Sequence, residues 1–221
     1  MFKFDGPIVN FFNKVADIII LNLLAIVCSI PIITIGASWT AMYYVTVKMV
    51  KNEESYIWKD YFKSFAQNFR QATCIWLINL VTLLVLGTNI YILVRGYIPG
   101  IPQFAYIITL ISFVAVVIVM MFEYPILSHF ANTVKNTIKN AMLLAVANLP
   151  YAILFTVLTL LPFILVFWAS WGLKFLPVIV LVGLSGPAYL CSLGWKRIFG
   201  KLDSNADQGE GDEQEESQES E

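Results

Sequence analysis

The chain has little charge for its length. Only 13% of its 221 residues are Asp, Glu, Lys or Arg, whereas 58% are hydrophobic. A soluble domain usually has about a quarter charged residues. This shortage of charge excludes an ordinary soluble domain and predicts an integral membrane protein, with the lipid membrane as its surroundings. The length fits one bundle of helices and not two domains.

Residues that build catalytic and metal sites are scarce as well. The chain has one histidine, His129, and three cysteines, Cys28, Cys74 and Cys191, which lie far apart in apolar sequence. A single histidine cannot form a His-rich metal site or a pair of haem ligands. The sequence also lacks His-Glu-x-x-His, Gly-x-Ser-x-Gly and a phosphate-binding glycine loop. We therefore expect no enzyme activity, no cofactor and no metal.

The charges that are present are separated by sign. All 14 Lys and Arg lie at or before Lys201, and nine of the 15 acidic residues lie within residues 203–221. Residues 1–202 therefore form a basic membrane bundle, and residues 203–221 form an acidic tail. The basic residues lie in loops between apolar segments, where membrane orientation requires them, so nucleic acid is not an expected partner. The tail lacks apolar periodicity, and we expect it to be disordered and cytoplasmic.

The apolar segments predict an all-α bundle of about five membrane-spanning helices, since one crossing needs about 20 residues. The predicted spans are residues 15–37, 72–94, 104–122, 141–172 and 173–193. The distribution of Lys and Arg predicts a cytoplasmic carboxyl end and an amino end on the outside. A turn back into the membrane at residues 31–50 would change the count to four or six and move the amino end inside.

The first span is interrupted near its end. Pro31 removes a backbone donor, Gly36 loosens the helix, and Thr34 with nearby serines can supply replacement hydrogen bonds. Opened backbone groups must be satisfied inside the lipid, so we interpret the interruption as a packing or docking kink. We expect residues 38–50 to continue as a helix that is partly interfacial.

Residues 51–71 predict an amphipathic helix with an aromatic stripe. Trp58, Phe62, Phe65 and Phe69 recur at helical spacing, with Lys, Asp, Asn and Arg between them. The expected place of this helix is the membrane interface, with aromatic rings in the lipid and basic groups at the headgroups. An ordinary connector packed on the bundle and a docking surface for a partner are equally open interpretations.

Few polar groups lie inside the predicted spans. Asp17 lies near the start of the first span, and Glu123 ends the third span six residues before His129. For Glu123 we favour a cap at the helix end over a Glu–His proton relay. Four deep amides are predicted to form hydrogen bonds between helices, with a polar cavity as the alternative; they are Asn22, Asn79, Asn89 and Asn148.

Three segments of the chain form a recognisable set, namely Asn22 to Tyr44 around the kink, Tyr61 to Ala72, and Asn136 to Ala141. Together they resemble the YesL family of bacterial integral membrane proteins, a family of unknown function. Members are often encoded beside carbohydrate ABC importers. The resemblance therefore implies an accessory subunit of such an importer, with its permease or ATPase subunits as partners. The family supplies no catalytic residues to carry over.

The sequence thus predicts a non-enzymatic accessory or assembly subunit in the bacterial cytoplasmic membrane. A small stand-alone transporter or channel is the alternative, with the kink and a second break at residues 183–187 lining its path. The expected partner-binding residues are Pro31, Thr34, Gly36, Trp58, Phe62, Phe65 and Phe69.

Overall fold

A computed structural model describes residues 7–53, 56–97, 102–130, 132–168 and 172–219, and the ordered elements in these ranges are all helices. The predicted all-α class is confirmed. The elements are α1 (Pro7–Ser29), the 3₁₀ helix η1 (Ile32–Thr34), α2 (Ile35–Lys51), α3 (Ile57–Arg95), α4 (Gln103–His129), α5 (Val134–Ala147), α6 (Leu149–Trp168), α7 (Gly172–Val182) and α8 (Ser185–Glu219).

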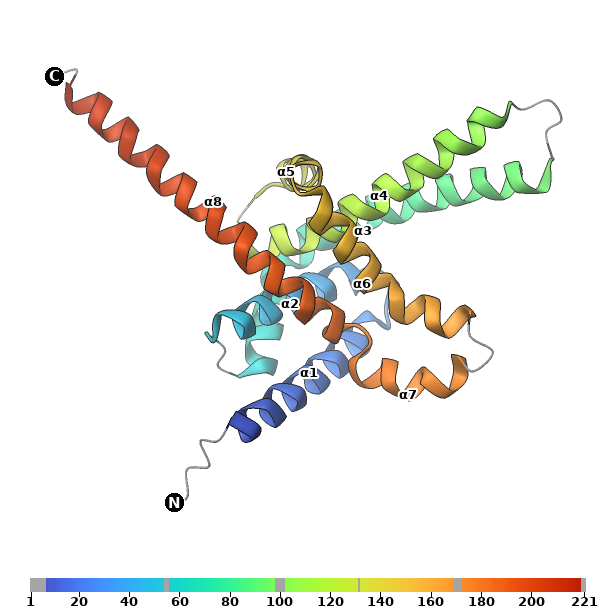
Figure 1. The fold of residues 1–221 in the computed structure, drawn as a ribbon, viewed down its shortest axis with the longest axis horizontal. Coiled ribbons are helices and arrows are strands. Elements are labelled where there is room, and N and C mark those ends of the chain that lie inside the picture. Colours follow the sequence, from blue (N-terminus) through green and yellow to red (C-terminus); the bar gives the residue numbers. More distant parts are fainter. Residues whose placement is uncertain (1–6, 54–55, 98–101, 131, 169–171, 220–221) are drawn as a thin grey trace.

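The central helix of the bundle is α2 (Figure 1). Twelve of its 17 residues are buried, and it packs against α3, α8 and α4. Small residues such as Gly36, Ala37 and Ala41 let the neighbouring helices approach it closely. The predicted helix over residues 38–50 is confirmed, and most of it is buried against the neighbouring helices.

The helices α1 and α2 fold back on each other as a hairpin. Lys14 Nζ donates a hydrogen bond of 3.0 Å to Asn52 Oδ1, which joins the start of α1 to the end of α2. The structure therefore has the turned-back arrangement that the sequence left as an alternative. The start of α1 therefore lies at the same end of the bundle as the end of α2.

One continuous helix contains both the aromatic stripe and the second predicted span. The 39 residues of α3 extend for about 58 Å at 1.5 Å per residue. The hydrocarbon of a bilayer is only about 30 Å thick. The apolar residues 72–94 fit that thickness, so the amphipathic residues 57–71 form an extension of the span beyond it. The returning helix α4 lies beside α3, and the two form a long arm (Figure 1).

The carboxyl-terminal half is bent twice. The helices α5 and α6 meet at 105°, so the apolar run of residues 141–172 is divided between them. A turn at Gly183 separates α7 from α8, which divides the predicted span of residues 173–193. From there α8 continues to Glu219 through the acidic tail, so the predicted disorder of the tail is not confirmed. Glu and Gln favour helix, which is consistent with this extension.

Several helices of the described residues can cross a membrane by length and composition. Three do so alone, namely Phe11–Ser29, Ile57–Arg95 and Phe104–His129, and the bent pair α5 and α6 would make a fourth. The chain is therefore a multi-pass membrane protein, whereas the count of five spans is not confirmed.

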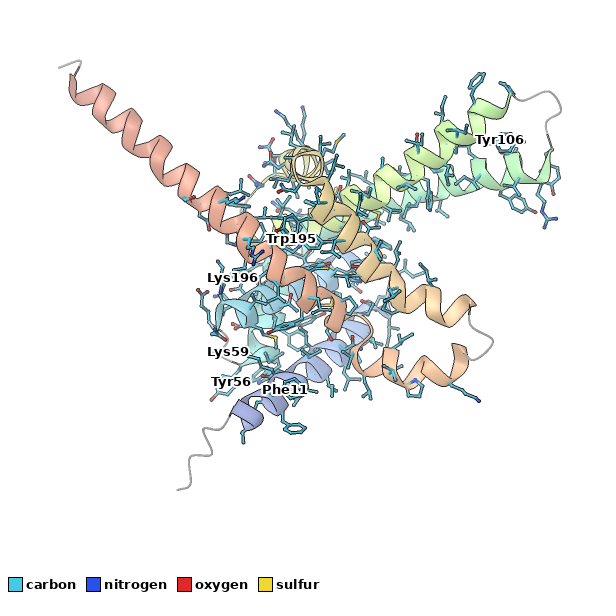
Figure 2. All side chains as sticks on the ribbon, in the orientation of Figure 1. Phe11, Tyr56, Lys59, Tyr106, Trp195 and Lys196 are labelled. Atoms are coloured by element: carbon cyan, nitrogen blue, oxygen red, sulfur yellow. The ribbon has the colours of Figure 1, made fainter. Side chains whose placement is uncertain are left out.

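Aromatic rings from three helices fill the centre of the bundle. Trp195 of α8 lies 4.8 Å from Phe122 of α4 and 5.4 Å from Phe155 of α6, measured between ring centroids. Trp195 is fully buried, and Figure 2 shows it on α8 in the middle of the bundle. This cluster joins the amino-terminal and carboxyl-terminal halves into one core.

Candidate functional site

The interruption after α1 is closed by hydrogen bonds from within the chain. Thr34 Oγ1 lies 2.6 Å from the Cys28 carbonyl oxygen and 2.7 Å from that of Pro31, within reach of either acceptor. The indole of Trp76 on α3 donates to the Ile32 carbonyl oxygen at 2.7 Å. Carbonyls opened by the break thus have partners, as a lipid environment requires.

A buried hydroxyl network ties this break to the centre of the bundle. Ser38 Oγ donates to the Ala25 carbonyl oxygen at 2.9 Å and lies 2.8 Å from the Tyr61 hydroxyl. Ser29 Oγ donates to Ser38 Oγ at 3.0 Å. The network joins α1, α2 and α3 at one point, so it fixes the angle at which the chain turns back.

Gly36 serves an internal contact in this structure. A Cβ at this position would lie 2.4 Å from the Ala72 carbonyl oxygen and 2.7 Å from Trp76 Cβ. The glycine therefore lets α2 pack directly against the backbone of α3. Gly36 is buried, and among the predicted partner residues of the break only Pro31 is exposed. The neighbours of Pro31, namely Ile30, Ile32 and Ile33, are exposed and form an apolar outer surface.

The aromatic stripe is divided between two surfaces. Phe65 packs between Tyr61 and Phe69, with ring centroids 6.2 and 5.6 Å away, and it contacts the core. Trp58 and Phe62 point outward, with 59% and 46% of their surface exposed. Phe65 and Phe69, the inward-facing residues of the stripe, therefore hold α3 to the bundle, as the connector interpretation predicts. The outer pair, Trp58 and Phe62, is open to lipid or to a partner.

Basic and aromatic side chains gather at one end of the molecule, which we term the basic end. It is defined by the residues Lys14, Lys48, Lys51, Lys59 and Lys196. Figure 2 shows Lys59, Tyr56 and Phe11 toward the same end of the molecule, with Tyr106 on the arm that extends away from it. Lys196 Nζ donates to the Val50 carbonyl oxygen, which places α8 at this end as well. Exposed aromatic and basic side chains together are typical of a membrane interface.

One ion pair holds α2 to α3 at the basic end. Lys48 Nζ lies 2.7 Å from Asp60 Oδ2. The hydrogen bond to the Asp60 carboxylate raises the pKa of Lys48, although partial burial opposes it. The lysine is thus protonated at neutral pH, and the pair fixes the start of α3 against the end of α2.

Glu123 is buried inside the bundle and does not cap a helix end. Only 1% of its surface is exposed, and the Asn79 amide of α3 donates a hydrogen bond to its carboxylate. His129 lies apart from it, stacked 4.2 Å from the Phe199 ring with Asp203 at 3.5 Å. The cap interpretation is therefore wrong, and the two residues of the proposed relay have separate partners. A buried carboxylate among membrane helices is a candidate functional group.

The second break is held mainly by the side-chain amide of Asn22, together with the Ser185 hydroxyl, which donates to the Ile18 carbonyl oxygen of α1 at 2.8 Å. Asn22 Nδ2 of α1 donates to the Val180 carbonyl oxygen at 2.7 Å. Its Oδ1 accepts from the backbone amides of Leu184 and Ser185 at 2.8 and 2.9 Å. This side chain replaces helix hydrogen bonds lost between α7 and α8. The prediction that Asn22 bonds between helices is confirmed.

Ser38 is one of the serines predicted to supply replacement hydrogen bonds at the break, and its bond to the Ala25 carbonyl oxygen confirms this. Sequence reasoning missed the parts played by Trp76 and Tyr61. An indole N–H in an apolar span needs a partner, and that need is the only signal that Trp76 gave in advance. The hydroxyl of Tyr61 gave none, because its partner depends on how the chain folds back. Among the described residues no group of three or more His, Cys, Asp or Glu is placed to hold a metal ion.

Comparison with known proteins finds one family. Residues 18–90, which extend from α1 to α3, match the family described as "Protein of unknown function, DUF624". The match covers the kink, the central helix and the aromatic stripe, and it is consistent with the resemblance seen in the sequence. No curated protein and no solved structure matches the chain.

Proposed function

Because the family that matches α1 to α3 has no assigned activity, we propose a function from the geometry: this chain is a non-enzymatic membrane subunit that docks onto another membrane protein. The observation that carries the proposal is a contrast. The polar groups of both breaks bond within the chain, whereas apolar and aromatic side chains beside them stand open. The family resemblance supports a carbohydrate ABC importer as the partner, through its permease or ATPase subunits.

The arm of α3 and α4 offers a second docking surface. Asn89 is exposed on this arm, and its amide donates only to the Val85 carbonyl oxygen of its own helix. Gly87 beside it has nothing within 4 Å of the position a Cβ would take. Small residues and amides are the groups through which helices associate within membranes. These positions therefore support contact with a helix of a partner.

The proposed setting is the bacterial cytoplasmic membrane, with the basic end and the carboxyl end in the cytoplasm. Lys and Arg are retained on the cytoplasmic side of membrane proteins. The hydrogen bond of Lys14 joins the first half of α1 to the end of α2, and the hydrogen bond of Lys196 joins α8 to the same place. In this orientation Trp58 and Phe62 would lie at the cytoplasmic interface, next to the partner's cytoplasmic subunits.

Replacing both Trp58 and Phe62 with alanine tests the docking surface. We expect the double variant to remain in the membrane, because both rings are exposed, and to lose at least about 90% of the co-purifying importer subunit. A loss of about 1.4 kcal/mol of binding free energy already weakens the affinity for the partner tenfold. The measurement is a gentle-detergent pull-down from the native membrane, with partners identified by mass.

The control replaces Ile153 and Val157, two exposed apolar residues of α6 that lie outside both proposed docking surfaces, with alanine. This variant should keep the partner. Phe65 is unsuitable as a test position because its ring packs on Tyr61 and Phe69. Equal recovery of the importer subunit with the Trp58/Phe62 variant and with the control would reject this surface. A pull-down that returned only the chain itself would reject the accessory function.

The buried pair of Glu123 and Asn79 favours the second candidate, a small transporter. A carboxylate inside a helix bundle can couple its protonation to movement of a solute. Replacing Glu123 with glutamine keeps the size and the hydrogen-bonding capacity of the side chain. If the chain is a transporter, the rate of solute flux into liposomes should fall more than about tenfold in this variant, because an essential ionisable group is lost.

Recovery of the importer subunit should be unchanged in the same variant, since Glu123 is only 1% exposed and cannot contact a partner. Flux by the unmodified chain that disappears with Glu123→Gln would establish the transporter. Absence of flux for sugars and ions, together with a retained partner, would reject it.

A further inference from the structure

A polar groove lies where α3 and α4 leave the predicted spans. It has a volume of about 870 Å³ and is bounded by residues 66–71 of α3, the end of α4 and the connection to α5. Neither the proposed docking surfaces nor the pair of Glu123 and Asn79 includes it. The groove therefore requires an explanation of its own.

The charges that line the groove have one sign. Its lining includes two basic side chains, Arg70 and His129, and no acidic side chain. Gln67, Gln71 and Asn132 add amides that can donate hydrogen bonds. Within the part of the chain that the structure describes, no carboxylate pairs with Arg70. The positive charge of the Arg70 guanidinium in this groove is therefore not neutralised by a carboxylate of the described residues.

The groove lies at the expected level of the lipid headgroups. The apolar part of α3 begins at Ala72, directly after Gln71, and the apolar run of α4 ends at Phe122, about five residues before the groove. At 1.5 Å per residue these five residues extend for about 8 Å, roughly the depth of a headgroup layer. An arginine at this level faces phosphate groups, which a guanidinium binds with two parallel hydrogen bonds.

One acidic side chain already approaches this groove from outside its lining. Asp203 Oδ1 of α8 lies 3.5 Å from His129 Nε2. His129 therefore faces an anionic group in this structure, while Arg70 on the other wall does not. A second groove beside the first shares Tyr44, Ser128 and His129 with it and contains Lys48, Lys51 and Glu53. In this second groove Lys48 is paired with Asp60. In the main groove Arg70 has no acidic partner among the described residues.

We propose that this groove binds a phosphate group, carried by an anionic lipid headgroup or by a soluble phosphate ester, between Arg70 and His129. The guanidinium of Arg70 supplies the paired hydrogen bonds, and the amides of Gln67 and Gln71 complete the contact. The proposal does not depend on docking to an importer, since it concerns the isolated chain.

The test is a titration of the full chain, purified in a neutral detergent, with dioleoylphosphatidylglycerol, followed by native mass spectrometry. We expect Arg70→Gln to weaken binding of this lipid about tenfold, the effect of one charge-assisted hydrogen bond. Arg70 is exposed, so the variant should fold, which the midpoint of thermal unfolding checks. The matched control is Arg95→Gln, which removes the same charge at the other end of α3, where Arg95 lies over the Tyr91 ring.

Inorganic phosphate separates the two sources of the phosphate group. Displacement of the lipid by millimolar phosphate supports a soluble ester, and lipid binding that phosphate does not displace supports a headgroup. Equal weakening by Arg70→Gln and Arg95→Gln would overturn the proposal, because it would indicate attraction by net charge alone. Failure of both the lipid and phosphate to bind the unmodified chain would overturn it as well. Neither result would affect the pull-down of the importer subunit.

Discussion

Gly36→Ala is expected to lower the free energy of unfolding by about 3 kcal/mol, as overpacking of a close helix contact does. The added Cβ would lie 2.4 Å from the carbonyl oxygen of Ala72, which is a backbone atom and cannot rotate away. The two helices would have to separate, and the hydrogen bond from Trp76 to the Ile32 carbonyl oxygen would be stretched. Alanine favours helix over glycine by about 1 kcal/mol, which offsets only part of this loss. Unfolding in mixed micelles with increasing denaturing detergent measures the difference.

Gly87→Ala supplies the matched control on the arm of α3. Nothing lies within 4 Å of the position that its Cβ would take. The same chemical change should therefore be neutral, or should stabilise the chain by up to about 1 kcal/mol through helix propensity. Equal stability of the Gly36 and Gly87 variants would show that α2 does not pack against α3 as closely as the structure has it.

The position of α2 shows what hydropathy can and cannot predict. The end of α3 at Arg95 and the start of α4 at Gln103 lie within one residue of the predicted bounds, whereas α3 begins 15 residues before the predicted start at 72 and α4 ends seven residues after the predicted end at 122. Hydropathy finds the apolar length that a bilayer requires, not the full length of the helix. The burial of α2 was not predicted, since lipid is as apolar as a protein core and both surroundings select the same residues. The reversal of the chain after Ser29 depends on Ser38, Tyr61 and Trp76, which come from two other helices. No local pattern contains that information.

The sequence predicted that the deep amides of the candidate site form hydrogen bonds, but not which partners these amides have. Two of the four deep amides, Asn22 and Asn79, bond to another helix as predicted. Asn89 and Asn148 instead bond to carbonyl oxygens one turn back in their own helices. The residue type is the same in all four positions. Which face of the helix each one occupies decides the outcome, and that depends on the packing of the whole bundle.

Asn22→Leu is expected to have the largest effect, a loss of about 4 kcal/mol in the free energy of unfolding, because each buried polar group left without a partner costs about 1–3 kcal/mol. Leucine keeps the branching and the number of heavy atoms of the side chain, so no cavity forms. It leaves the amides of Leu184 and Ser185 and the carbonyl oxygen of Val180 without the partner that they have now. Asn22 is fully buried, so water from outside cannot replace the lost groups without opening α1 from α7.

Asn89→Leu is the control for this substitution, since Asn89 is exposed and bonds only within its own helix. It should change stability by less than about 0.5 kcal/mol, as surface substitutions usually do. Amide hydrogen exchange gives a second readout, in which Asn22→Leu should accelerate exchange at Leu184 and Ser185 more than elsewhere in α8. If exchange there stayed as slow as in the unmodified chain, the amide of Asn22 would not be what holds the second break, and α7 and α8 would have to be joined by another contact.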